Sequence, residues 1–152
     1  MKFSIKRLKT NTAARRGFEM ITDSPDVRMR IRGRTPEELF RNALQGVASI
    51  MAPGPMKARG GRVAEAIMVR AVDINSLLVE FLSETLARAD GRDALFTGVV
   101  FRAFGEDFLE AELAGAAIDD RMRDVRAISY QDVDIKKSPE TGFFETDLIL
   151  EL

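Results

Sequence analysis

The amino-acid sequence predicts an α+β domain of two layers, in which two helices pack on a mixed, largely antiparallel sheet. Two segments carry apolar residues at helical spacing, residues 27–31 alternate apolar side chains with arginines, and strand patterns separated by short turns follow from residue 94 onward. The chain has 152 residues, of which 45% are hydrophobic, so it is long enough to bury one core. We therefore expect a single domain at residues 17–152.

Two short strands are expected at the start of this domain. Residues 18–21 form an apolar run, and Val27, Met29 and Ile31 alternate with arginines. This alternation has the period of two that is typical of a strand with one buried face. Gly33 is expected to end the second strand.

The first helix is expected to begin after Thr35. Thr35 can cap the helix, Pro36 suits the first helical position, and Glu38 completes the pattern of a capping box. Prolines and a glycine at residues 53–55 are expected to end it. Residues 53–62 are predicted to form a flexible connection within the domain.

The second helix is expected to follow a strand at residues 63–72, whose mostly apolar sequence predicts a central place in the sheet. Asp73 can cap this helix, and Asp90 with Gly91 is predicted to terminate it. The apolar stripe of the helix is interpreted as core packing.

The remaining segments are predicted to be strands. Residues 95–104 and 108–113 flank a glycine-containing turn and indicate a hairpin. Residues 125–130 are expected to form another strand that leads into a segment with Asp132 and Asp134 on its outer face. In the last strand, residues 143–152, one face is expected to carry Phe144, Thr146, Leu148, Leu150 and Leu152, and the other Glu145, Asp147, Ile149 and Glu151.

The absence of histidine and cysteine excludes several classes of function. The chain can form no Ser-His-Asp or Cys-His nucleophile system, no disulfide and no ordinary zinc or copper site. A bound metal must be held by oxygen atoms, which favours Ca²⁺ or Mg²⁺. General acid-base chemistry would fall to carboxylates, lysines or Tyr130.

Charge and hydropathy suggest where the protein acts. No run of 18 apolar residues is present and the N-terminus lacks the apolar centre of a signal peptide, so we expect a cytoplasmic protein. The net charge of −1 does not indicate a nucleic-acid partner. Residues 1–16 carry six basic residues and no acid, and are interpreted either as a solvated, partly disordered arm or as a contact to RNA phosphates.

Asp26 and Glu151 differ from the other acids in their position along the chain. Glu151 precedes Leu152, whose terminal carboxylate adds oxygen donors, and Asp26 directly precedes the second strand. If the last strand is central, these carboxylates meet at one edge of the sheet, where a divalent cation would offset their repulsion. Asp23 and Asp147 are the acids nearest to them in sequence and are expected to support the ligands.

Five segments, in order along the chain, resemble the motifs of the archease family. Residues 18–27 resemble the family's opening, an aromatic, an acid and then D-H-T-A-D-[IV]. Residues 33–43 resemble G-x-[ST]-x-E-E-[AL]-F-x-N-A, and residues 73–84 resemble D-x-x-x-L-L-x-x-[WF]-L-[NS]-E. Residues 126–130 resemble K-A-[VI]-[TS]-Y, and the final residues resemble a terminal apolar strand that ends in an acid.

The resemblance implies an archease-like α+β fold that contains a strand-helix-strand-strand module. It also implies a metal site formed by Asp26, Glu151 and the carboxylate of Leu152. Arg126 corresponds to the family's basic residue that is implicated in activating a ligase. Asp23, Arg126 and Glu151 stand where the family usually has His, Lys and Asp.

The function implied by the resemblance is that of a non-catalytic activator of the RtcB-type RNA ligase. This ligase joins 2′,3′-cyclic-phosphate or 3′-phosphate RNA ends to 5′-hydroxyl ends in tRNA splicing and RNA repair, and the activator promotes its guanylylation and multiple turnover. The implied partners are the ligase and, through it, tRNA or broken RNA, with no membrane or DNA. Two alternatives are a chaperone or modulator of another nucleic-acid-modifying enzyme, such as an RNA methyltransferase, and a metal-dependent hydrolase that acts alone.

Overall fold

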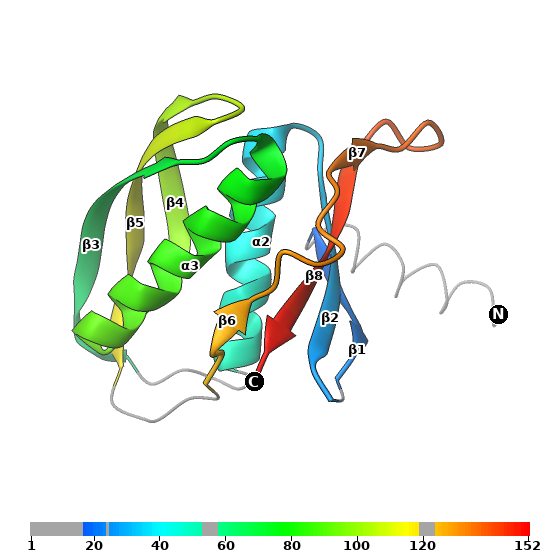
Figure 1. The fold of residues 1–152 in the computed structure, drawn as a ribbon. Coiled ribbons are helices and arrows are strands. Elements are labelled where there is room, and N and C mark those ends of the chain that lie inside the picture. The colour runs from blue at the N-terminus through cyan, green and yellow to red at the C-terminus, as the bar shows by residue number, and fades with distance from the viewer. Residues whose placement is uncertain (1–16, 24, 53–57, 119–123) are drawn as a thin grey trace, which may run out of the picture.

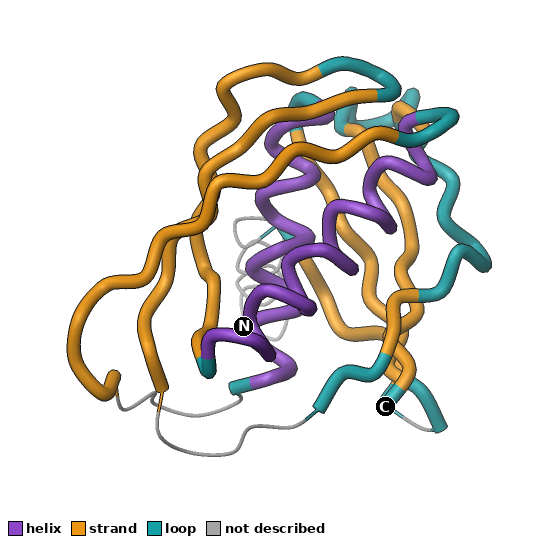
Figure 2. The backbone as a smooth tube through the Cα atoms, turned by 60° about the vertical axis from the view of Figure 1, so that its left-hand side comes forward, coloured by secondary structure: helices purple, strands orange, loops and turns teal. Residues whose placement is uncertain are grey.

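Two helices lie between two antiparallel sheets (Figure 1) in the computed structural model, which describes residues 17–23, 25–52, 58–118 and 124–152. The predicted α+β class and the packing of two helices on antiparallel strands are confirmed. The strands divide into two sheets rather than one, so the helices form a middle layer (Figure 2). The predicted basic arm, residues 1–16, lies outside the described residues.

The five-stranded sheet, here called sheet A, has β8 at its centre. The strand order is β1-β2-β8-β6, and β7 pairs with the other end of β8. All of these pairs are antiparallel. The strands are β1 (Phe18–Thr22), β2 (Val27–Gly33), β6 (Ala127–Ile128), β7 (Lys136–Lys137) and β8 (Phe144–Glu151).

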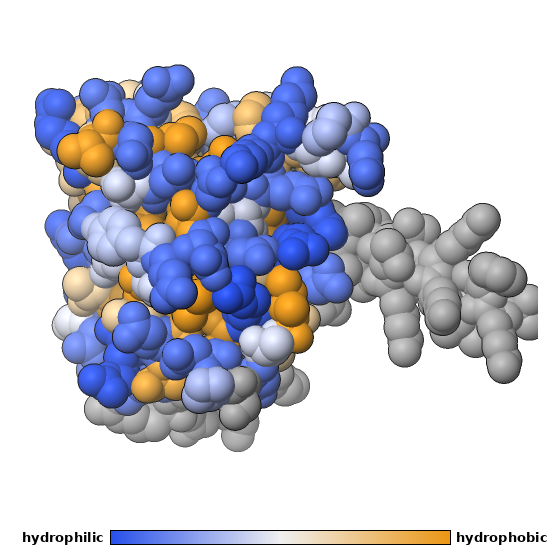
Figure 3. Space-filling model, turned by 45° about the vertical axis from the view of Figure 1, so that its right-hand side comes forward, coloured by the Kyte–Doolittle hydropathy of each residue, from blue (hydrophilic) through white to orange (hydrophobic). Residues whose placement is uncertain are grey.

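The two faces of sheet A differ in polarity, as the alternation in the sequence predicts. The side chains of Val27, Ile31 and Leu148 are fully buried against the helices. The outer face carries arginines and carboxylates, and the side of the molecule shown in Figure 3 is predominantly hydrophilic. The period of two in β2 and β8 therefore separates the core from solvent.

The three-stranded sheet, here called sheet B, has the order β3-β5-β4. Its strands are β3 (Ala58–Arg70), β4 (Ala94–Phe104) and β5 (Phe108–Ile118), and the helix between β3 and β4 is α3 (Ile74–Arg92). The segments β3, α3, β4 and β5 form a strand-helix-strand-strand module. The predicted hairpin is confirmed by β4 and β5.

The prediction that the strand after residue 62 is central was wrong, because β3 is an edge strand. Val63, Ile67 and Val69 are buried, whereas Ala64 and Ala66 on the opposite face are exposed. Alanines on the solvent face made the sequence look uniformly apolar. The prediction of a flexible connection up to residue 62 was also wrong in part, since β3 already begins at Ala58.

Both helices begin where their capping residues predict. The helix α2 (Pro36–Met51) is capped by Thr35, whose hydroxyl accepts a hydrogen bond from the Glu38 amide at 3.1 Å. In α3, the Asp73 carboxylate accepts from the Ser76 amide at 2.8 Å.

The end of α3 differs from the prediction. Asp90 and Gly91 lie inside the helix, which ends at Arg92, and Asp93 follows in the left-handed conformation with φ of 48°. A single glycine was not enough to stop this helix because the buried residue Ala89 still packs in the core at its last turns.

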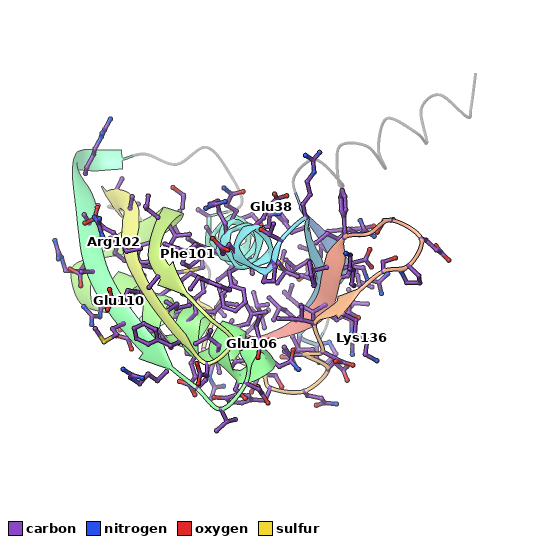
Figure 4. All side chains as sticks on the ribbon, turned by 90° about the horizontal axis from the view of Figure 1, so that it is seen from above. Glu38, Phe101, Arg102, Glu106, Glu110 and Lys136 are labelled. Atoms are coloured by element: carbon purple, nitrogen blue, oxygen red, sulfur yellow. The ribbon has the colours of Figure 1, made fainter. Side chains whose placement is uncertain are left out.

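Aromatic side chains join the helices to sheet B. Phe40 of α2 lies 5.7 Å from Phe81 of α3 and 4.9 Å from Phe104 of β4, measured between ring centroids. Phe101 of β4 lies 5.8 Å from Phe81 and belongs to the same cluster, on the side of sheet B that faces the helices (Figure 4). These ring contacts attach both helices to β4.

Residues 125–137, here called the bridging segment, depart most from the predicted strands. They form only the two-residue strands β6 and β7, joined by a turn in which Asp132 has φ of 67°. The prediction that Asp132 and Asp134 lie on the outer face of a strand was therefore wrong. The bridging segment crosses the space between α3 and β8 (Figure 1).

Candidate functional site

Three segments that are far apart in the sequence meet at one end of sheet A. Val27 of β2 pairs with Leu150 of β8, so Asp26 and Glu151 are the next positions of the same antiparallel register. On the other side of β8, Ala127 pairs with Glu151, and the Arg126 amide donates a hydrogen bond to the Glu151 carbonyl at 2.7 Å. The chain end lies at the end of sheet A where β1 turns into β2 (Figure 1).

The residues at this end differ in exposure. Glu151 and Arg126 are exposed, and Asp26 is half-buried. Leu152 is half-buried and packs against the core cluster. Leu150, the residue immediately before Glu151, is fully buried, so β8 is firmly packed up to that point.

Further along the outer face of sheet A, three arginines of β2 are paired with carboxylates. Arg28 contacts Asp132 at 2.6 Å and Asp147 at 3.4 Å, and Arg30 contacts Asp147 at 3.0 Å. The hydrogen bond to Asp132 raises the pKa of Arg28, and the hydrogen bond to Asp147 raises the pKa of Arg30. The remaining contacts are those of Arg32 with Glu19 at 3.7 Å and Glu145 at 3.3 Å.

Asp26, Glu151 and Arg126 lie beyond this row of ion pairs. Within the described part of the chain, none of their charged groups forms an ion pair or a side-chain hydrogen bond. The acids in the middle of the sheet are therefore neutralised by arginines, whereas the two acids at its end are not. Two neighbouring carboxylates without a basic partner favour the binding of a cation.

The donor set at this end suits a hard divalent cation. Asp26 and Glu151 offer side-chain oxygens of the kind that Ca²⁺ and Mg²⁺ prefer, and a terminal carboxylate at Leu152 would add further oxygens. No group of three or more Asp, Glu, His or Cys side chains with metal-binding geometry occurs among the described residues. The candidate site therefore depends on Leu152 for its third donor group.

The two supporting acids have different surroundings. Asp147 lies four residues before Glu151 on the same face of β8, which corresponds to roughly 13 Å along a strand. Its two carboxylate oxygens face Arg28 and Arg30. Asp23 is exposed in the loop between β1 and β2, three residues before Asp26. Asp23 is therefore close to Asp26 in sequence, whereas Asp147 lies within the row of ion pairs.

The bridging segment is attached to both layers by hydrogen bonds that the sequence did not reveal. The Ser129 amide donates to the Ile149 carbonyl at 2.9 Å, and the Asp134 amide donates to the Thr146 hydroxyl at 2.9 Å. On the other side, the Ile135 amide donates to the Asn75 side chain in α3 at 2.8 Å. These hydrogen bonds to β8 and α3 fix the path of the chain that follows Arg126.

Tyr130 is the other side chain of note in this segment. Its hydroxyl donates a hydrogen bond to the carboxylate of Glu80 in α3, and this bond raises the pKa of Tyr130. The motif at residues 126–130 drew attention to the tyrosine, but Glu80 carried no signal of its own in the sequence. Pairing between them depends on the docking of the bridging segment on α3.

Sequence comparisons give a consistent picture. Residues 18–150 match the profile of the archease protein family. A protein archease of Methanosarcina barkeri is 26% identical over 81% of this chain and 88% of its own length. A protein archease of Aeropyrum pernix is also 26% identical, over 79% of this chain and 86% of its own length.

Solved structures share the fold. The solution structure of protein 1598 of Methanobacterium thermoautotrophicum has a TM-score of 0.63 at 22% identity, covering 90% of this chain and 99% of that chain. The crystal structure of an archease of Thermotoga maritima, described as a possible chaperone, has a TM-score of 0.61 at 10% identity, covering 88% and 96%. At these identities the likeness establishes the arrangement of helices and sheets.

Proposed function

Because the chain belongs to the archease family, we propose that it activates an RNA ligase of the RtcB type without catalysing the ligation itself. The ligase would join 2′,3′-cyclic-phosphate or 3′-phosphate RNA ends to 5′-hydroxyl ends, in tRNA splicing or RNA repair. The protein would promote guanylylation of the ligase and so its multiple turnover. The observation that supports this proposal is the meeting of Asp26, Glu151 and Arg126 at one exposed end of sheet A, without ion-pair partners among the described residues.

In this proposal the end of sheet A is the working end of the molecule. Asp26, Glu151 and the carboxylate of Leu152 would hold Ca²⁺ or Mg²⁺, which when bound supplies positive charge for phosphate oxygens. Arg126 would add a permanent positive charge beside the cation, because its guanidinium forms no ion pair with a carboxylate among the described residues. Asp23 would assist from the loop between β1 and β2.

A ligation assay tests the activator role. We expect the wild-type protein to raise the number of turnovers per molecule of the ligase from the same organism. Asp26→Ala and Arg126→Ala should reduce this stimulation about tenfold or more, because each removes one charged group at the working end. Glu112→Gln on sheet B, a change in an acid of β5 whose side chain is 46% exposed and pairs with Arg102, is the matched control and should retain the stimulation. No gain in turnover with the wild-type protein would contradict the proposal.

A metal titration tests the cation site separately. Calorimetry with Ca²⁺ and Mg²⁺ should detect one site on protein that ends at Leu152. Asp26→Asn, or a Gly-Ser extension after Leu152, should weaken the affinity about tenfold or more, because each removes charged oxygen donors. Equal affinity for the extended and unextended proteins would remove Leu152 from the ligand set.

A second candidate function is that of a chaperone or modulator for another nucleic-acid-modifying enzyme, such as an RNA methyltransferase. It is favoured by the description of the Thermotoga maritima archease as a possible chaperone. Affinity purification from the native host separates the two candidates. Recovery of the RNA ligase as the main partner supports activation, and recovery of a methyltransferase in its place supports the second function.

A further inference from the structure

Tyr130 is an exception among the aromatic residues of this protein. The sequence contains ten phenylalanines, one tyrosine and no tryptophan. Every phenylalanine in the described part of the chain is buried or half-buried, whereas Tyr130 is 57% exposed. Tyr130 is therefore the aromatic residue that the described surface presents to solvent. Tyrosine combines an apolar ring with a polar hydroxyl, which suits an exposed residue of this kind to a protein interface.

The exposed ring is held in one orientation. Its hydroxyl donates to the Glu80 carboxylate in α3, so the far end of the side chain is fixed to a helix. On either side of it the bridging segment is bound to β8 through Ser129 and to α3 through Ile135. Arg28 holds Asp132 in the turn that follows the tyrosine. The ring is thus exposed yet preorganised, which lowers the entropy lost when a partner covers it.

The charges around Tyr130 favour a protein partner over a nucleic acid. Glu80 accepts the hydrogen bond from the hydroxyl, and Asp132 and Asp134 lie in the bridging segment. Asp132 and Asp134 are balanced by Arg28 and Lys136, but the Glu80 carboxylate has only the neutral phenol as its hydrogen-bond donor among the described residues. The uncompensated Glu80 carboxylate beside the ring disfavours a phosphate backbone and favours an apolar pocket with a basic rim.

We propose that Tyr130, positioned by Glu80, is the anchor with which this protein docks into an apolar, basic-rimmed pocket of the RNA ligase. The inference rests on the proposed function and adds a docking residue to it. Arg126 lies four residues before Tyr130 on the same bridging segment, so docking of the ring brings the end of sheet A to the partner. Tyrosine and arginine are the residue types that most often dominate protein interfaces.

The test separates docking from activation. Labelled protein is titrated with the ligase to measure the dissociation constant, and ligation is measured across a range of protein concentrations. We expect Tyr130→Ala to raise both the dissociation constant and the half-maximal concentration about tenfold or more. The maximal stimulation should stay at the wild-type level. Tyr130→Phe and Glu80→Ala, which keep the ring and remove its hydrogen bond, should raise both constants only about two- to threefold.

Controls distinguish a contact from a structural role. Met68→Ala changes a residue of similar exposure, 61%, on β3 of sheet B and should leave binding unchanged. Arg126→Ala should lower the maximal stimulation. Thermal melts of all variants should agree with the wild type, and a large loss of stability in Tyr130→Ala would overturn the proposal by making the ring a structural element.

The remaining outcomes are also decisive. Unchanged ligase binding by Tyr130→Ala overturns the proposal while leaving the activator function intact. If an RNA oligonucleotide binds without the ligase and this binding depends on Tyr130, the ring contacts RNA and the docking proposal is overturned as well. If the ligase binds tightly and in a Tyr130-dependent way but is not stimulated, the activator function is refuted and the docking site is supported. If the wild-type protein does not bind the ligase at all, both the activator function and the docking site are refuted.

Discussion

Glu65 is a carboxylate that points inward from an edge strand. Its side chain is only 15% exposed and accepts a hydrogen bond from Arg88 of α3 at 2.8 Å, with Arg92 as a second partner. The hydrogen bond from Arg88 lowers the pKa of Glu65 below its ordinary value of 4.5. Charge placed on the inner face of an edge strand also discourages pairing with the strand of another molecule. Glu65 therefore joins α3 to β3 and protects the edge of sheet B.

We predict that Glu65→Gln lowers the melting temperature by several degrees at pH 7. Because the pKa of Glu65 is lower in the folded state, its charge stabilises the fold above the ordinary pKa, and this stabilisation is lost as the pH falls below 4.5 through the lowered pKa. The difference between variant and wild type should therefore shrink in acid. Glu84→Gln, which alters a more exposed partner of Arg88, is the control and should have a smaller effect at pH 7. A difference that persists unchanged at pH 3 contradicts the prediction.

Several residues that carried the family resemblance have structural tasks. A side chain at Gly33 would place its Cβ 2.3 Å from the Leu39 amide nitrogen, so only glycine allows β2 to approach the start of α2 this closely. Asn42 donates to the Arg32 carbonyl at 2.7 Å and ties α2 to β2. The motif at residues 33–43 thus indicates the fold, and the residues at the end of sheet A are the ones for which we propose a role in function.

At the scale of the element, the capping residue decides where α2 begins. Thr35→Ala removes the acceptor for the Glu38 amide and should cost about 1 kcal/mol in the free energy of unfolding. Urea denaturation should show a lower midpoint with an unchanged slope. Thr35→Ser, which keeps the hydroxyl, should retain most of the stability. Equal midpoints for the alanine variant and the wild type would show that water replaces the cap without loss.

Prediction from sequence succeeded for elements that depend on local interactions. Thr35 and Asp73 act on amides three residues away, so the starts of both helices could be read directly. The bridging segment could not, because its path depends on Arg28 and Asn75, which lie on other elements. The place of β3 was missed because its exposed alanines look the same in sequence as buried ones.

The relative positions of the candidate site residues could be predicted in part, and their role as a site stays a prediction. Once β8 is central and pairs with β2, the register of Val27 with Leu150 brings Asp26 to Glu151. The row of ion pairs that engages Asp147 depends on cross-strand neighbours, which the alternation of one strand does not specify. The link of Tyr130 to Glu80 likewise requires the position of α3.

At the scale of the whole molecule, the middle layer of helices makes the two sheets depend on each other. Phe40 is fully buried and contacts Phe81 and Phe104, so Phe40→Ala should destabilise the protein by roughly 3–5 kcal/mol. Unfolding should remain a single transition. Far-UV circular dichroism follows the helices and the fluorescence of the single tyrosine follows the bridging segment, and the two curves should coincide. Separate midpoints would show that the bridging segment unfolds independently of the helices and would contradict the prediction.

The central position of β8 has a consequence for synthesis on the ribosome. Arg30 and its partner Asp147 are 117 residues apart in the sequence, whereas β3, β4 and β5 follow one another with only α3 between them. A nascent chain can complete sheet B while β2 still lacks its neighbour. The edge of β2 is then open to other chains until translation reaches β8, and the same step assembles Asp26 with Glu151. The end of the molecule proposed to meet the ligase is thus built after sheet B.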